Sequence, residues 1–325
     1  MTNARENSIC NHTGDGSLCG NTPETICNHT GKHSGEDSLC GNTPEKNCNH
    51  TRNHSGDDSP CRNTPESIHR VHFVGAGPGA PDLITLRGLR LLEQADVVIY
   101  AGSLVNPALL GSVHEDCTIY NSAEMTLEQV IEVIHSAYAE GKDIVRLHTG
   151  DPCLYGAIRE QMDRLGELGI PYDDTPGVSS FCGAAASLGE EYTLPGVSQS
   201  VIITRMAGRT PVPEREALAS LAAHGASMVI FLSAGMLEEV QRALLAGAYT
   251  ENTPAAIVYK ATWPEEKLVR CTVGSLARCG KEHGIRQTAL ILAGDFLGRN
   301  YERSRLYDPG FSTGFRNAQR DTEDV

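Results

Sequence analysis

Short apolar runs that end in glycine-rich turns recur along most of the chain. The first run, at residues 71–74, is rich in valine and enters a glycine- and proline-rich loop at residues 75–79. Beyond the loop, Leu83, Leu86 and Leu89 recur at helical spacing. This order predicts a strand, a tight turn and a helix, with Leu83, Leu86 and Leu89 on one helical face. The glycines allow unusual backbone dihedrals and close approach to a ligand.

The same apolar pattern predicts further strands, separated by segments of helical spacing. We expect these strands at residues 96–100, 143–147, 198–204, 228–233, 255–260 and 289–294. A helix of small residues is expected at 183–188, following a turn at 175–180. Strands that alternate with helices are typical of the α/β class.

The first glycine loop matches the glycine spacing of a dinucleotide-binding fingerprint but not its other requirements. Gly75, Gly77 and Ala80 have the required spacing. That fingerprint also needs an acidic residue after the second strand, where this chain has Ala101-Gly102-Ser103. Pro78 lacks the N–H that a phosphate-binding loop would offer. The pattern therefore argues against a nucleotide-phosphate site.

Composition and charge narrow the range of partners. The 325 residues include 27 Lys and Arg against 41 Asp and Glu, so no basic face for nucleic acid is expected. No apolar run approaches the ~18 residues of a membrane span. The N-terminus lacks the apolar region of a signal peptide. We expect a cytoplasmic protein that binds neither nucleic acid nor membrane.

Residues 10–66 contain three imperfect copies of a Cys- and His-containing unit. They hold almost no large apolar residues, so residues 1–68 are expected to form a disordered tail. Cys/His-rich tracts often bind zinc or cobalt. The alternatives are a plain polar tail or translated repetitive DNA. The candidate metal ligands are Cys10, His12, Cys19, Cys27, His29, Cys40, Cys48, His50 and Cys61.

A second turn motif follows the strand at 143–147. Gly150, Asp151 and Pro152 provide turn chemistry at the carboxyl end of that strand. In open α/β sheets, ligands bind at this edge. The turn at residues 175–180 is expected at the same edge.

Two of these motifs together resemble the signatures of the tetrapyrrole (uroporphyrinogen/precorrin) methyltransferase family. Residues 74–88 resemble the first signature and residues 145–156 the second. The resemblance runs from about residue 69 to about residue 300. It implies two α/β domains, at residues 69–194 and 195–308, with S-adenosylmethionine in the cleft between them. Residues 309–325 would form a polar tail.

Finer features point to one branch of this family. Segments 100–105, 147–152, 176–181 and 259–267 resemble the branch that methylates C11 of precorrin-4 or cobalt-precorrin-4 in cobalamin biosynthesis. Two alternatives are a precorrin methyltransferase that acts at another carbon, and a cobalt- or zinc-binding accessory protein that works through the repeats. The resemblance also implies a homodimer.

The resemblance further implies positions for the site. The methyl donor would be held by Pro78, Thr149, Gly150, Asp151, Leu154, Ser179, Ser180, Leu232 and Ala261. The tetrapyrrole carries many acetate and propionate groups, which pair well with cationic side chains. Candidate substrate-binding residues are Arg159, Arg205, Arg209, Lys260 and Trp263. For each cation the alternative is a solvated surface residue, and for Trp263 it is a packing anchor.

No catalytic acid or base emerges from the motifs. Attack by an electron-rich carbon on a sulfonium methyl needs alignment and exclusion of water rather than acid–base groups. The uroporphyrinogen-specific branch has an Asp and a Lys with proton-transfer roles. Here those places hold Ala101 and, approximately, Asn121 or Ser122, which argues against uroporphyrinogen as the substrate.

Overall fold

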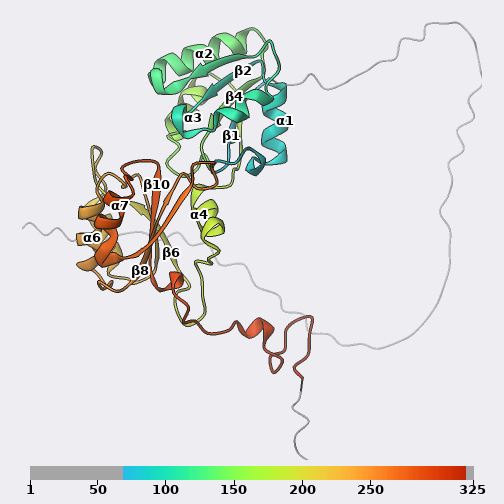
Figure 1. Ribbon diagram of the computed structural model, residues 1–325. Coiled ribbons are helices and arrows are strands. Elements are labelled where there is room, and N and C mark those ends of the chain that lie inside the picture. The colour runs from blue at the N-terminus through green and yellow to red at the C-terminus, as the bar shows by residue number, and fades with distance from the viewer. Residues whose placement is uncertain (1–68, 320–325) are drawn as a thin grey trace, which may run out of the picture. The chain divides into compact units, whose positions relative to one another are not determined.

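Two five-stranded sheets, each packed against helices, form the framework of the chain (Figure 1). The computed structural model describes residues 69–319. All strands of the first sheet are parallel, in the order β3-β2-β4-β1-β5. Its strands are β1 (Val71–Gly75), β2 (Val97–Tyr100), β3 (Thr118–Asn121), β4 (Ile144–His148) and β5 (Tyr172–Thr175).

Helices cover both faces of the first sheet, as a parallel sheet requires. They are α1 (Leu86–Gln94), α2 (Leu127–Ala139) and α3 (Arg159–Glu167). Leu92 of α1 packs with Val98 and Leu147 on one face. Ile134 of α2 and Leu165 of α3 pack on the other. Every residue of the central strand β4 is buried, including Arg146 and His148.

The helix after the first glycine loop starts later than predicted. Residues Pro81–Leu83 form a 3₁₀ turn, and α1 begins at Leu86, capped by the Thr85 hydroxyl. Leu86 is 63% exposed, whereas Gly88 and Leu92 are buried. The prediction that Leu83, Leu86 and Leu89 lie on one helical face was therefore wrong for Leu83, which precedes the cap at Thr85.

The second sheet is mixed and has the order β6-β7-β10-β8-β9. Its strands are β6 (Val201–Arg205), β7 (Ser227–Phe231), β8 (Pro254–Tyr259), β9 (Lys267–Thr272) and β10 (Ala289–Ala293). Strands β6 and β7 are parallel, whereas β10 runs antiparallel to both β7 and β8. The last strand in sequence therefore occupies the centre of the sheet.

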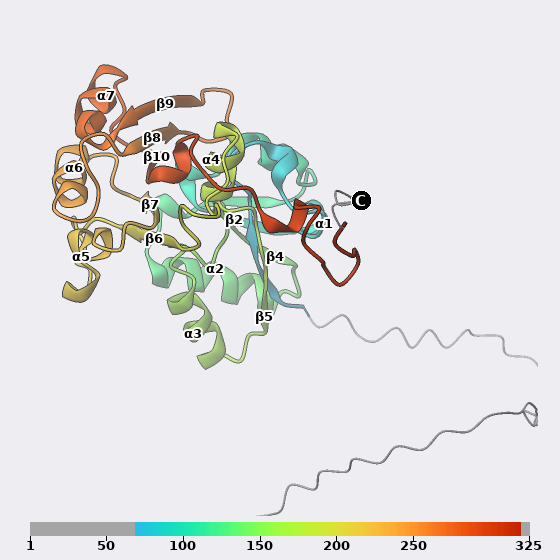
Figure 2. The same ribbon diagram turned by 90° about the horizontal axis from the view of Figure 1, so that it is seen from below.

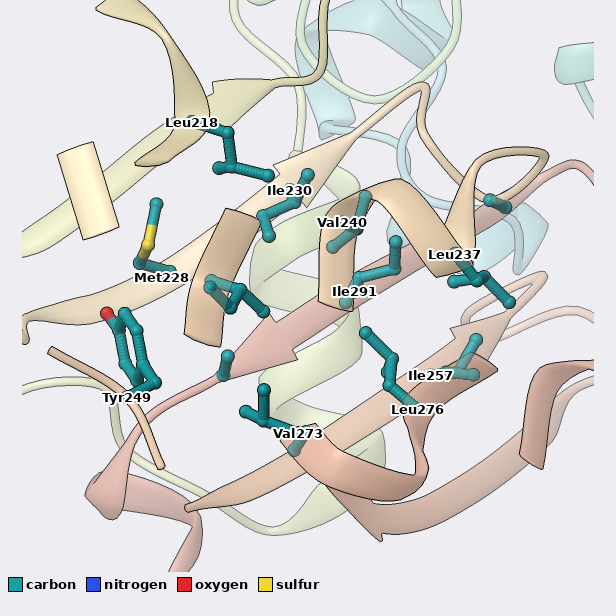
Figure 3. Packing of buried hydrophobic residues seen from close by; sticks show 14 of the residues in the cluster. Leu218, Met228, Ile230, Leu237, Val240, Tyr249, Ile257, Val273, Leu276 and Ile291 are labelled. Atoms are coloured by element: carbon teal, nitrogen blue, oxygen red, sulfur yellow. The ribbon is translucent and has the colours of Figure 1, made fainter. Parts of the chain in front are cut away.

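Helices also pack against both faces of this sheet (Figure 2). The helices are α4 (Ser180–Leu188), α5 (Leu218–Ala222), α6 (Leu237–Leu245) and α7 (Leu276–Glu282). Figure 3 shows Val240 of α6 and Leu276 of α7 against Ile257 and Ile291 of the sheet. Ala184 of α4 belongs to the cluster on the opposite face. Helix α4 follows β5 of the first sheet yet contributes to the core of the second.

The predicted strands are confirmed within a few residues at their ends. Strands β3, β5 and β9 were not predicted; all three lie at the edges of their sheets, whereas the edge strand β6 was predicted. Short 3₁₀ helices complete the regular structure at Pro81–Leu83, Gly102–Leu104, Pro107–Ser112, Ser122–Glu124, Glu214–Glu216, Val273–Ser275, Asp295–Leu297 and Arg305–Tyr307. Across residues 69–319, none of the helices combines the length and apolar character needed to cross a membrane.

Candidate functional site

Three loops meet at the carboxyl edge of the first sheet. The loops after β1 and β4 form a two-way backbone bridge, with Gly77 N donating to Gly150 O at 3.2 Å and Gly150 N donating to Gly77 O at 2.8 Å. A Cβ on Gly177, in the loop after β5, would lie 2.0 Å from Gly150 O and 2.7 Å from the Gly75 Cα. Only glycine permits such an approach between backbones.

Asp151 fixes two of these loops to each other. Its Oδ1 accepts the backbone N–H of Cys153 at 2.9 Å, and its Oδ2 accepts that of Gly177 at 3.1 Å. Charge-assisted hydrogen bonds of this kind are stronger than neutral ones. The carboxylate that the motif singled out therefore acts as a clamp at the turn.

The first glycine loop is held from the other side by residues that follow β8. The indole Nε1 of Trp263 donates to Pro78 O at 3.1 Å, and the Thr262 hydroxyl accepts the Ala80 N–H at 2.9 Å. A Cβ on Gly79 would lie 2.0 Å from Trp263 Cδ1. Trp263 thus packs as an anchor between the two sheets and also faces the pocket described next.

A pocket of about 680 Å³ opens between the loops of the two sheets. All nine predicted donor-binding positions line it, namely Pro78, Thr149, Gly150, Asp151, Leu154, Ser179, Ser180, Leu232 and Ala261. Its size is that of a small-molecule site, for which about 300–1,000 Å³ is usual. The structure thus brings together residues that span 184 positions of the sequence, from 78 to 261.

Backbone strain is concentrated around this pocket. Leu232, Lys260 and Thr262 have positive φ angles of 52°, 47° and 67°. Such angles are uncommon for residues other than glycine, and a β-branched threonine is a clear outlier. Each costs on the order of 1–3 kcal/mol, and such strain clusters at functional sites.

Four of the five candidate substrate-binding residues line the pocket: Arg205, Arg209, Lys260 and Trp263. Arg159 does not. Its side chain is 87% exposed on α3 and is paired with Asp163 at 2.8 Å. Arg159 therefore lies outside this pocket, because the buried face of α3 is the one that carries Gln161 and Leu165.

The cationic side chains that line the pocket differ in the protein groups with which they already interact. The Arg205 guanidinium donates to the carbonyl oxygens of Thr210 at 3.2 Å and Pro211 at 2.6 Å, so it shapes its own loop. The Lys260 Nζ lies 4.7 Å from the centre of the Trp263 ring and 3.5 Å from a Glu265 carboxylate oxygen. Arg209 is exposed at the pocket.

Sequence reasoning missed several lining residues. Arg286, Gln287 and Thr288 line the pocket from the connection before β10. The sequence of that connection contains no recognisable motif. It lies at the pocket because β10 pairs with β8. Leu104 and Tyr155 add exposed apolar surface at the pocket.

The lining has little acid–base chemistry. Asp151 is the only carboxylate among the lining residues, and both of its oxygens accept backbone N–H groups. The Asp151 carboxylate, chiefly through a hydrogen bond with the Cys153 thiol, raises the pKa of that thiol to about 11, so the thiol stays protonated near neutral pH. Ser122 donates to Tyr100 O and accepts from Arg146, which is a structural role. The pocket is suited to a reaction that depends on alignment.

The predicted metal ligands in the tail lie outside the described residues. Between residues 69 and 319, no group of three or more His, Cys, Asp or Glu side chains is arranged to hold a metal ion. Zinc or cobalt binding by the repeats therefore stays a prediction.

Trp263 provides a direct optical test of the pocket. It is the only tryptophan of the chain, and it lines the site. We expect saturable addition of S-adenosylhomocysteine to change the tryptophan emission. Trp263→Phe should lose this change in emission. For the wild type, calorimetry should give the same dissociation constant as the emission titration. Binding in the calorimeter without a change in emission would contradict this placement.

His148, at the end of β4, should make stability depend on pH. Burial, followed by the charge of Arg146, lowers its pKa to about 3 from 6.5. The unfolded state therefore binds a proton that the folded state does not, so stability falls as pH falls from 6.5 toward 3. The slope approaches about 1.4 kcal/mol per pH unit.

Urea unfolding at pH 7.5 and at pH 5 measures this effect. His148→Leu should lose less stability between the two pH values than the wild type does. An equal loss in both proteins would contradict the assignment to His148.

Comparison with known proteins places this chain in a known family. Residues 70–277 match the model of the Tetrapyrrole (Corrin/Porphyrin) Methylases. The chain is 51% identical over 252 residues to the cobalt-precorrin-4 C(11)-methyltransferase of Methanocaldococcus jannaschii, covering 77% of this chain and 97% of that relative. It is 45% identical over 249 residues to the precorrin-4 C(11)-methyltransferase of Pseudomonas aeruginosa. This match covers 74% of this chain and 99% of that relative.

Solved structures agree with the sequence relatives. The X-ray structure of cobalt-precorrin-4 methyltransferase, a cobalamin biosynthetic enzyme, matches with a TM-score of 0.70 and 46% identity over 71% of this chain and 96% of that one. Uroporphyrin-III C-methyltransferase from Thermus thermophilus, in complex with S-adenosyl homocysteine, matches with a TM-score of 0.59 and 28% identity. The match covers 70% of this chain and 93% of that one. The predicted two-sheet α/β methylase fold is confirmed, and the chain belongs to the tetrapyrrole (corrin/porphyrin) methylase family.

Proposed function

We propose that this protein transfers a methyl group from S-adenosylmethionine to C11 of precorrin-4 or cobalt-precorrin-4 in cobalamin biosynthesis. The main support for this proposal is that all nine predicted donor-binding positions line one pocket. The names of the two methyltransferases given above, which this chain matches over nearly their whole length, support C11 of this macrocycle.

The residues present fit a sulfonium nucleoside that carries no phosphate better than a phosphate-bearing one. Pro78 offers no N–H, and its carbonyl is occupied by Trp263. Thr149, Gly150 and Ser179 present backbone and hydroxyl groups at the carboxyl edge of the first sheet. When bound, the donor supplies a methyl group activated on a sulfonium sulfur. The loops hold it in place, and backbone dipoles stabilise its charge.

Methyl transfer then depends on alignment. An electron pair of the electron-rich macrocycle would form the C11–methyl bond as the methyl–sulfur bond breaks; the pair of the broken bond would pass to sulfur and the positive charge to the macrocycle. The protein contributes orientation and exclusion of water, which together lower the barrier without a dedicated base. Exposed apolar side chains at Leu104, Tyr155 and Leu232 provide a surface for one face of the macrocycle.

The proposal includes the organisation of the chain. The strands of the first sheet all lie within residues 69–194 and those of the second within 195–308, which supports two domains with these bounds. Helix α4 lies in the first range but packs on the second sheet, so it would join the two. A homodimer, which the family resemblance implies, and a cytoplasmic location, which the composition predicts, are also part of the proposal.

Incubation with methyl-labelled S-adenosylmethionine tests the function. With precorrin-4 and with cobalt-precorrin-4 as separate substrates, we expect a new methyl group at C11, located by NMR. Uroporphyrinogen III serves as the control and should not be methylated. A methyl group at another carbon would favour the sister-enzyme alternative. Full activity after removal of residues 1–68 would show that the repeats are accessory.

A further inference from the structure

A second pocket of about 400 Å³ adjoins the first. Its lining residues are Tyr259, Lys267, His283, Gly284, Ile285, Arg286 and Gln287. Arg286 and Gln287 also line the larger pocket, so both pockets border these two residues.

The register of the second sheet explains how the two pockets are joined. Tyr259, at the end of β8, pairs with Lys267 of β9 on one side and with Ala289 of β10 on the other. The connection before Ala289 therefore lies next to Tyr259 on the side opposite Lys267. The Lys260 N–H donates to Thr288 O at 2.9 Å and holds this connection against the end of β8.

The charge at these two pockets is opposite to that of the whole chain. Acidic residues outnumber basic ones by 41 to 27 in the sequence. The cationic lining residues of the two pockets are Arg205, Arg209, Lys260, Lys267 and Arg286. The only acidic lining residue is Asp151, which is engaged by backbone N–H groups. This imbalance favours a ligand with several carboxylates.

We propose that the second pocket receives a peripheral carboxylate side chain of the tetrapyrrole whose ring occupies the first pocket. Arg286 stands at the junction and pairs with the carboxylate, and Lys267 adds positive charge behind it. The smaller pocket has room for an acetate or propionate arm. A guanidinium binds a carboxylate through two parallel hydrogen bonds, which fixes the orientation of the ring as well as its affinity. This inference rests on the proposed function and makes Arg286 a specificity-determining residue.

The test compares Arg286→Gln and Lys267→Gln with the matched control Arg278→Gln. Arg278 is exposed on α7, pairs with Glu282 at 3.2 Å and lines neither pocket. We expect Arg286→Gln to raise the KM for the tetrapyrrole about tenfold or more, the loss typical of one charged hydrogen bond. Lys267→Gln should have a smaller effect, and Arg286→Lys should restore part of the loss. The dissociation constant for S-adenosylhomocysteine, measured by calorimetry, should stay at the wild-type value.

Two outcomes would overturn the subsite. One is an equal tetrapyrrole KM in Arg286→Gln and Arg278→Gln. The other is weaker S-adenosylhomocysteine binding in Arg286→Gln with an unchanged tetrapyrrole KM, which would assign the guanidinium to the donor's own carboxylate.

Binding without turnover separates this inference from the proposed function. Precorrin-4 and cobalt-precorrin-4 are each equilibrated with the protein by dialysis in the absence of donor. Tetrapyrrole binding that is weakened in Arg286→Gln would support the subsite even if the wild type failed to methylate C11. If the wild type binds neither macrocycle, the subsite fails together with the proposed function.

Discussion

Gly177→Ala is expected to abolish donor binding and to destabilise the fold. The added Cβ would lie 2.0 Å from Gly150 O and 2.7 Å from the Gly75 Cα, and both neighbours are backbone atoms that cannot rotate away. Overpacking against side chains costs about 1–3 kcal/mol, and a clash with two backbones belongs at or above that range. Calorimetric titration with S-adenosylhomocysteine and thermal unfolding measure the two effects.

Gly166→Ala is the matched control for this substitution. Gly166 lies within α3, and a Cβ there would meet nothing within 4 Å. Alanine in place of a helical glycine should stabilise the protein by roughly 0.5–1 kcal/mol and leave donor affinity unchanged. Wild-type affinity and melting temperature in Gly177→Ala would show that the three loops do not pack as described.

Asp151→Asn is expected to weaken binding of S-adenosylhomocysteine by about 10- to 100-fold, the range that follows from loss of one hydrogen bond to a charged group. The amide keeps the shape of the side chain, but its NH₂ group must face one of two backbone donors, the N–H of Cys153 or that of Gly177. One loop is then released from the turn. Asp163→Asn, on the exposed face of α3, is the control and should bind normally.

The Cys153 thiol gives a second, independent measurement on the same variant. The side chain of Asp151 is the main cause of its raised pKa. Removal of the carboxylate should lower that pKa, so a thiol-specific reagent should modify Cys153 faster at pH 8 in Asp151→Asn than in the wild type. Unchanged affinity together with an unchanged modification rate would contradict the clamp.

The sequence predicted central strands well and edge strands poorly, for a physical reason. Strand β4 is buried along its whole length, and its apolar residues Ile144, Val145 and Leu147 make it recognisable. Strand β9 is paired on one side only, and its residues Lys267, Leu268 and Arg270 are exposed. Its polar positions weaken the pattern on which strand prediction depends. The same holds for β3, where Thr118 and Ile119 are exposed.

The site shows a similar division. Local motifs were enough to place Thr149, Gly150 and Asp151, because a turn after a buried strand fixes their position. Arg286 reaches the pocket only because β10 pairs with β8, and no local pattern encodes that pairing. Arg159 does not line the pocket, because a residue only a few positions after a motif can lie on the outer face of the following helix.

The central position of β10 has a consequence for synthesis of the chain. The first sheet is complete once Thr175 has left the ribosome, so the glycine loops can assemble early. The second sheet must wait for Ala293, because until then β7 and β8 have no strand between them. Nascent chains fold from the N-terminus, and unpaired strand edges invite misassembly. The part of the pocket formed by the loops of the first sheet is thus built first. The nascent chain then passes through a stage in which β7 and β8 each have an unpaired edge that a chaperone would recognise.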